Sequence, residues 1–262
     1  MQVKEIVDHL ENIAPLHLQE AYDNCGLLTG TTDMTCTGVL CTLDATEAVI
    51  LEAVAKGCNM VVAHHPILFS GLKKINGISY VEKAVIAAIK HDVAIYAIHT
   101  NLDNVIGGVN GKIAQKIGLG QVEILDPKPG AGPGIGAGII GQLPAPVHEA
   151  DFLQNLAHIF KIPTIKHSPF LGKKLQKIAI CGGSGAFLTQ KALEMGVDAF
   201  VTSDLKYHDY FDANGQLLLA DIGHFESEQY TVELLVELLQ PKFLTFAVLK
   251  SDTKTNPVGY FM

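Results

Sequence analysis

The chain has 262 residues, of which 48% are hydrophobic and 18% are charged, a composition typical of a compact folded protein. This length suits one large α/β domain or two smaller ones, each with its own core. The formal net charge of -8 argues against sequence-independent nucleic-acid binding, because an acidic surface repels phosphate backbones. No run of about 20 apolar residues is present, so we expect no membrane span and no membrane partner.

The five cysteines are odd in number, are irregularly spaced and include no CxxC pair. They therefore indicate reduced thiols rather than a disulfide framework or a zinc knuckle. The N-terminal stretch MQVKEIVDHLENIAPL is amphipathic and interrupted by charges, and it lacks the apolar core and cleavage site of a signal peptide. Together these features predict a cytoplasmic protein.

Short apolar runs bounded by turn residues alternate with segments of helical periodicity, which predicts an α/β architecture. The expected strands are Gly38–Leu43, Met60–Ala63, Val93–Ile98, Ala137–Gln142, Lys177–Cys181, Ala199–Thr202, Gln216–Ala220 and Phe243–Leu249. The expected helices are Asp44–Ala55, Tyr80–Lys90, Gly108–Ile117, His148–Phe160, Ala186–Met195, Lys206–Ala213 and Ser227–Leu239. The segment Asp126–Gly138, DPKPGAGPGIGAG, is interpreted as a linker or an exposed loop, because its prolines and glycines cannot continue a helix or a central strand.

Two neighbouring histidines follow the apolar run of VVAHHP, just beyond the end of an expected strand. In open α/β sheets ligands bind at the carboxyl ends of strands, because the loops there converge on a crevice. His64 and His65 point in opposite directions if the chain is extended, so two metal ions could take one imidazole each. The alternative is a pair of hydrogen-bonded histidines at a strand end.

A second group follows the next strand, in HTNLDN. The carboxylate of Asp103 is a candidate metal ligand, although a carboxylate at such a place is also a common turn or helix cap. His99 is either a ligand or a group that holds a ligand in place, and we favour the second role.

A third group lies in LLLADIGHFESE, where His224 and Glu228 are four residues apart at the start of an expected helix. This spacing puts both side chains on one face, one turn apart, as in helices that present paired metal ligands. The alternative is that the acidic residues merely favour the positive end of the helix. That alternative does not explain His224, which the same dipole disfavours when it is protonated.

These residues exceed what one four-coordinate ion with an open position needs, and they suit two ions about 3.5–4 Å apart, bridged by a carboxylate and a water. Nitrogen and oxygen ligands without a thiolate fit Zn, Fe, Mn, Co or Ni. The predicted ligands are His64, His65, Asp103, His224 and Glu228.

Two further segments are candidates for lining the site. CGGSGA, at Cys181–Ala186, either brings backbone N–H groups close to an anion or forms a simple tight turn. In TSDLKYH, the side chains of Thr202, Asp204 and His208 are candidates for binding substrate or donating protons. The alternative there is ordinary helix capping by Ser203 or Asp204.

The blocks VVAHHP, HTNLDN and GHFESE, in this order, resemble the signature blocks of the Nif-three-like family, whose members are often labelled GTP cyclohydrolase 1 type 2 homologue. AYDNCGLLTG and TSDLKYHDYFDA are similar to further family segments, so the resemblance covers nearly the whole chain. It implies a dinuclear centre on the predicted ligands, with Glu228 as a bridge, in the cleft between two α/β lobes, and a toroidal homohexamer. We place the lobes at residues 1–125 plus 229–262 and at residues 126–228.

From the ligand set we expect a metal-dependent hydrolase that acts on a small substrate. The resemblance implies GTP cyclohydrolase-like ring opening as one reaction, and hydrolysis of a phosphoester or amide bond is another. His99 and His208 are the candidate proton carriers. The alternative is a non-catalytic metal-handling or scaffold protein that acts as a hexameric ring. A regulator that binds nucleic acid fits poorly with the acidic charge.

Overall fold

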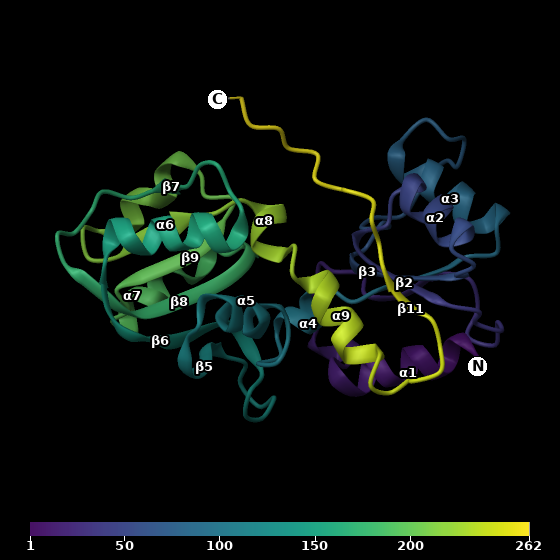
Figure 1. Cartoon of the computed structure of the whole chain (residues 1–262), viewed down its shortest axis with the longest axis horizontal. Helices are drawn as coiled ribbons and strands as arrows, with labels where there is room; N and C mark the ends of the chain where they lie inside the picture. The colour runs from purple at the N-terminus through teal and green to yellow at the C-terminus, as the bar shows by residue number, and fades with distance from the viewer. Residues whose placement is uncertain (262) are drawn as a thin grey trace. The chain divides into compact units, whose positions relative to one another are not determined.

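The computed structural model describes residues 1–261, which form two compact units. The first unit contains Met1–Leu102 and Thr231–Pro257, and the second contains Asp103–Tyr230 and residues 258–261. The lobes expected from the sequence, at residues 1–125 plus 229–262 and at residues 126–228, stay a prediction. Each unit combines one β-sheet with helices (Figure 1), so the expected α/β fold class is confirmed.

The first unit is built on a five-stranded sheet with the order β1-β4-β3-β2-β11. The strands are β1 (Gly26–Thr29), β2 (Val39–Asp44), β3 (Met60–His65), β4 (Ala94–Ala97) and β11 (Val248–Lys250). All pairs are parallel except β1 with β4. Its helices are α1 (Val3–Ile13), η1 (Leu16–Leu18), α2 (Glu47–Ala55), α3 (Tyr80–Lys90) and α9 (Thr231–Leu239). Figure 1 shows α2 and α3 on one side of the sheet and α1 and α9 on the other.

The central strands of this sheet are covered by helices on both faces, which explains their continuous apolar sequences. The polar residues come only where these strands end. Asp44 at the end of β2 pairs in register with His65 at the end of β3. Ala63 of β3 pairs with Ala97 of β4, so the residues that follow both strands also emerge side by side. The parallel register therefore brings His64, His65 and His99 together at the carboxyl ends of the central strands.

The second unit is built on a six-stranded sheet with the order β5-β6-β8-β9-β10-β7. The strands are β5 (Gly120–Pro127), β6 (Gly136–His148), β7 (Lys166–His167), β8 (Lys174–Ser184), β9 (Ala199–Ser203) and β10 (Leu218–Asp221). β8, β9 and β10 are parallel, and the other pairs are antiparallel. The helices are α5 (Val109–Ile117), α6 (Glu149–Phe160), η2 (Ala186–Leu188), α7 (Thr189–Glu194), η3 (Tyr207–Ala213) and α8 (His224–Glu228). The short helix α4 (Thr100–Asp103) begins in the first unit, and its last residue is the first residue of the second.

Alternate residues of β6 and β8 point to opposite faces of this sheet. On one face, Ile140 and Ala179 join a buried core with residues of η2, α7 and η3. Helices α5 and α6 pack against β6 and β8. No helix among residues 1–261 has both the length and the apolar character needed to cross a membrane.

The structure corrects several sequence-based expectations. The expected helix Ser227–Leu239 is two helices, because α8 ends at Glu228 and α9 begins at Thr231. Between them Gln229 donates its side-chain amide to the carbonyl of Phe160, and the Tyr230 hydroxyl donates to the carbonyl of Ile159. The expected helix at Lys206–Ala213 is the 3-10 helix η3. Of the two alternatives for the glycine- and proline-rich segment, the exposed loop is the one found, because the segment connects β5 to β6 within the second unit.

Candidate metal-binding residues

Three histidines cluster in the first unit, beyond the ends of β3 and β4. One potential ligand atom from each of His64, His65 and His99 lies within 4.8 Å of the other two. Their ring centroids are separated by 4.9, 5.1 and 5.3 Å. His64 is buried, whereas His65 and His99 are partly exposed. A set of imidazoles this close together offers nitrogen ligands of the kind that transition-metal ions prefer.

The two adjacent histidines are oriented by groups that can only accept hydrogen bonds. Nδ1 of His64 lies 2.9 Å from the carbonyl oxygen of Ile98, and Nδ1 of His65 lies 2.8 Å from Oδ1 of Asp44. The other oxygen of Asp44 accepts a 2.6 Å hydrogen bond from the Thr255 hydroxyl. Nδ1 must therefore carry the proton in both rings, which makes Nε2 the ligand atom. Metal-binding histidines are held in this way by carbonyl and carboxylate groups.

His99 is held in the same manner by a buried aspartate. Its Nδ1 lies 2.9 Å from Oδ1 of Asp23, whose side chain is fully buried. The second oxygen of Asp23 accepts hydrogen bonds from the backbone N–H and the hydroxyl of Thr100. Burial alone would raise the pKa of Asp23, but the hydrogen bonds from His99 and Thr100 outweigh it and hold this pKa far below its usual range. Because the carboxylate can only accept, Nδ1 of His99 is the donor of this hydrogen bond.

In the second unit, α8 presents a histidine and a glutamate on one face. Nε2 of His224 lies 3.2 Å from Oε2 of Glu228, and its Nδ1 lies 2.6 Å from Oδ2 of Asp204. The hydrogen bond to Glu228 is the largest cause of a His224 pKa raised to about 9; burial lowers it, and Asp204 raises it further. Glu228 is buried. A buried carboxylate needs a cation beside it, which the protonated imidazole supplies here and a metal ion is able to replace.

A glycine allows the backbone to approach Glu228 closely. Gly183 has φ +63°, and a Cβ there would collide with Oε1 of Glu228. Its N–H donates to Oγ of Ser227 at 3.0 Å, and its carbonyl accepts from the hydroxyl of Ser203 at 2.5 Å. The segment CGGSGA therefore brings β8 against the helix that carries the two candidate ligands.

Asp103 is the last residue of α4. Its backbone carbonyl accepts a hydrogen bond of 3.1 Å from the amide of Asn110, whose side-chain oxygen accepts the N–H of Gly182 at 2.8 Å. Burial raises the pKa of the Cys181 thiol, and the negative charges of Asp103 and Glu228 add to this rise. Both carboxylates therefore lie near the same thiol, within the second unit.

His208 is placed differently from the other predicted residues. It is exposed on η3, with its ring 5.1 Å from that of Tyr207 and 6.2 Å from that of Phe211. The groups of potential metal ligands within residues 1–261 do not include it. In the same segment, Thr202 donates its hydroxyl to the Gly183 carbonyl at 3.2 Å.

Sequence reasoning missed Asp23 and Asp44, and it considered Asp204 only as a substrate-binding or capping residue. Asp44 ends the apolar run VLCTLD, so it was visible as an acid at the end of an expected strand, whereas no strand was expected near Asp23 in AYDNC. Their partners His65 and His99 lie 21 and 76 residues further along the chain. Only the fold shows which histidine each aspartate orients.

The comparisons with known proteins agree with one another. The family Duf34/NIF3 (NGG1p interacting factor 3) matches residues 1–257. A Clostridium acetobutylicum protein named "GTP cyclohydrolase 1 type 2 homolog" is 32% identical over 243 residues, covering 92% of this chain and 90% of the relative. A Lactococcus lactis protein of the same name is 32% identical over 258 residues, covering 98% of both. The crystal structure of Staphylococcus aureus protein SA1388 matches with a TM-score of 0.92 at 28% identity, covering 100% of this chain and 99% of that one.

Proposed function

The chain belongs to the Duf34/NIF3 family, and on this premise we propose that it is a metal-dependent hydrolase with a dinuclear centre. One observation carries the proposal. Nδ1 of His64 faces a carbonyl oxygen, and Nδ1 of His65 and of His224 each faces a carboxylate. This arrangement leaves Nε2 as the ligand atom of His64 and His65, as in histidines that bind metal ions. In His224, Nε2 faces Glu228, the other proposed ligand of α8, so a metal ion would take the place of the proton between them.

The donors suit the proposed ions. The set combines imidazole nitrogens with carboxylate oxygens, which fits Zn, Fe, Mn, Co or Ni. Glu228, buried and salt-bridged to His224, is the proposed bridge between two ions. Bound divalent ions supply Lewis acidity and lower the pKa of water toward neutrality. The residues proposed to hold the ions are His64, His65, Asp103, His224 and Glu228.

The residues of the chain supply the proton transfer. We assign the role of proton carrier to His99, because the ionised Asp23 fixes its Nδ1–H and leaves Nε2 to accept and release a proton. His208, the other candidate, is exposed and packs beside Tyr207, so we rank it second.

The proposed substrate is a small molecule of the nucleotide, phosphoester or cyclic amide class. The name of the Clostridium and Lactococcus relatives makes nucleotide ring opening one reaction to test. We also propose a homohexamer and a cytoplasmic location, which the sequence resemblance and the cysteine content respectively predict.

Metal analysis of the purified protein tests the centre. We expect two ions per chain in the parent, and fewer in His64→Ala and Glu228→Ala, because each variant removes a ligand. His158→Ala is the matched control, since His158 is exposed on α6, and it should retain both ions. One ion or none in the parent would contradict a dinuclear centre.

An activity screen separates the hydrolase from a non-catalytic metal protein. The metal-loaded protein is offered nucleoside triphosphates, phosphoesters and cyclic amides, beside a His99→Gln variant. We expect turnover of one class by the parent, and loss of turnover with full metal content in His99→Gln. A fully loaded parent that is inert toward every class would refute the hydrolase and favour a metal-handling protein.

A further inference from the structure

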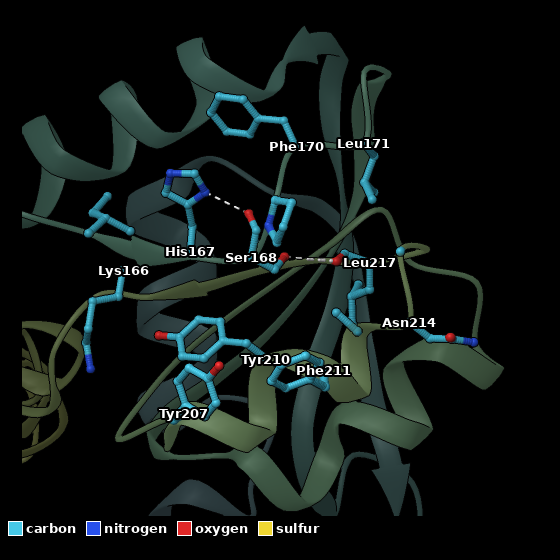
Figure 2. A pocket seen from close by; sticks show the side chains of 14 residues that line it. Lys166, His167, Ser168, Phe170, Leu171, Tyr207, Tyr210, Phe211, Asn214 and Leu217 are labelled. Carbon is cyan, nitrogen blue, oxygen red and sulfur yellow. Dashed lines mark hydrogen bonds between the residues drawn. The ribbon is translucent and has the colours of Figure 1, made fainter.

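A pocket of about 1050 Å³ lies in the second unit, between the segment 165–171 and η3. Its volume is at the upper end of the range of small-molecule sites. Figure 2 shows rings from two directions: His167 and Phe170 come from the segment around β7, and Tyr207, Tyr210 and Phe211 come from η3. None of these side chains belongs to the proposed metal centre.

One wall of the pocket is a pair of parallel rings. The rings of His167 and Phe170 are stacked, with centroids 4.8 Å apart and an interplanar angle of 12°. Ser168, which lies between His167 and Phe170 in the chain, is hydrogen-bonded to β10 and to the residue before that strand. Its N–H donates to the carbonyl of Leu219, its hydroxyl accepts the N–H of Leu219, and the same hydroxyl donates to the carbonyl of Leu217. This wall is therefore fixed to the sheet.

The far end of the same segment is anchored as well. The buried carboxylate of Glu149, at the start of α6, accepts the N–H groups of Leu171 at 2.6 Å and Gly172 at 2.9 Å. Both ends of the wall are thus held by hydrogen bonds within the unit. A site held in this way is formed before its ligand arrives, so less conformational entropy is lost on binding.

The opposite wall exposes aromatic rings to solvent. Tyr207 is 74% exposed and Phe211 is 66% exposed, and their rings meet edge to face at 5.5 Å. On the first wall, Phe170 is 50% exposed. Large apolar rings that gather around a concave surface without being buried are typical of binding sites.

The polar groups of the pocket carry little net charge. The ammonium of Lys166 is 2.6 Å from the buried carboxylate of Asp221, so these two charges offset each other. Nδ1 of His167 donates to the carbonyl of Ser168 at 2.7 Å, which leaves Nε2 of the neutral ring as an acceptor. The pocket thus favours an uncharged ligand with an N–H donor over an anion.

We propose that this pocket binds a flat, uncharged heteroaromatic ring of the nucleobase type. Aromatic side chains hold such rings by stacking, as in proteins that bind unpaired bases. The edge of the ring would donate an N–H to Nε2 of His167. The phosphate of a nucleotide is not a recognition element here, because the lysine in the wall is already paired with Asp221. The proposal is independent of the metal centre and of hydrolysis.

Titration of the full chain with adenosine tests the proposal. Isothermal calorimetry gives the affinity, and saturation-transfer NMR shows which protons touch the protein. We expect saturable binding with the strongest transfer to the adenine protons, no binding of ribose, and no gain in affinity for adenosine monophosphate. Absence of adenosine binding, or equal binding of ribose 5-phosphate, would overturn the proposal.

Matched variants locate the site. Phe170→Ala and Phe211→Ala remove exposed rings from the two walls, and each should weaken adenosine binding roughly 5- to 150-fold. Phe187→Ala, which removes a 69% exposed ring outside the pocket, should leave binding unchanged. His64→Ala should also leave it unchanged. Binding that survives both wall variants, or that is lost in His64→Ala, would contradict the assigned site.

Discussion

Asp23 and His99 lie 76 residues apart in the chain and form a 2.9 Å hydrogen bond between Oδ1 and Nδ1. The same relationship joins Asp44 to His65 and Asp204 to His224. A carboxylate on Nδ1 fixes the tautomer and the plane of an imidazole, and it increases the basicity of Nε2. This repeated pairing is the structural basis of the proposed metal chemistry.

Replacing Asp23 with asparagine should destabilise the metal-free protein by about 1.5–3 kcal/mol at neutral pH, because a buried charged acceptor is lost. An asparagine amide has a single acceptor oxygen, so with that oxygen toward Thr100 its NH2 group would face Nδ1 of His99. The folded-state pKa of Asp23 is depressed, so its contribution is present above its ordinary pKa of 3.8 and is lost as the pH falls below it. Urea unfolding of both proteins at a series of pH values should show that the difference between their free energies of unfolding becomes smaller as the pH falls. A difference independent of pH would contradict this.

Asp44→Asn should weaken metal binding about 10- to 100-fold without removing a ligand, because it frees the ring of His65 to rotate. Thr255→Val, which removes the 2.6 Å hydrogen bond to Asp44, should have a smaller effect in the same direction. Competition with a chelator of known affinity measures both. Asp8→Asn, at an exposed position on α1, is the control. Unchanged affinity in Asp44→Asn would contradict the positioning role.

Gly183→Ala should displace Glu228 and lower the metal content. The substitution has two effects: it strains the backbone at φ +63°, and it makes the new Cβ collide with the carboxylate of Glu228. Gly196→Ala separates the two causes, because Gly196 has φ +60° and open space around its Cβ position. We expect both variants to lose stability but only Gly183→Ala to lose metal, as measured by thermal unfolding and metal analysis. Equal metal loss in the two would show that the contact with Glu228 is unimportant.

Metal binding should release a proton from His224 at pH 7.5. Its pKa of about 9 means that the metal-free imidazole is protonated there, and a metal ion must displace the proton from Nε2. The apparent affinity should therefore rise with pH until about pH 9. Calorimetry in buffers of different ionisation enthalpy counts the protons. The Glu228→Gln variant lacks the largest cause of the raised His224 pKa, so it should release fewer protons for each metal ion bound.

Much of the fold was predictable from hydrophobic pattern. The helix expected at Tyr80–Lys90 has the bounds of α3, where the Ser79 hydroxyl accepts the N–H of Glu82 and caps the first turn. The apolar central strands were equally clear, because burial on both faces requires continuous hydrophobic sequence. The edge strands β1 and β5 were missed. β5, with the sequence GQVEILDP, is largely exposed and lacks that signal.

The site was predictable in part, for a related reason. His224 and Glu228 lie within one helical turn, so their spacing alone predicted that they share a face. The aspartates that orient the histidines depend on strand register and on contacts distant in sequence, which no local pattern encodes. The aromatic pocket was not predictable from the sequence. Its walls lie in a loop around a two-residue strand and in a 3-10 helix, and neither has a clear periodic pattern.

The most direct test of the proposed dinuclear centre is a crystal structure of the metal-loaded protein, with diffraction data collected at the absorption edge of the bound metal. The account predicts two anomalous peaks per chain about 3.5–4 Å apart, bound by His64, His65, Asp103 and His224, with Glu228 between them. A single peak, or two peaks at separate sites of which neither involves Glu228, would contradict it.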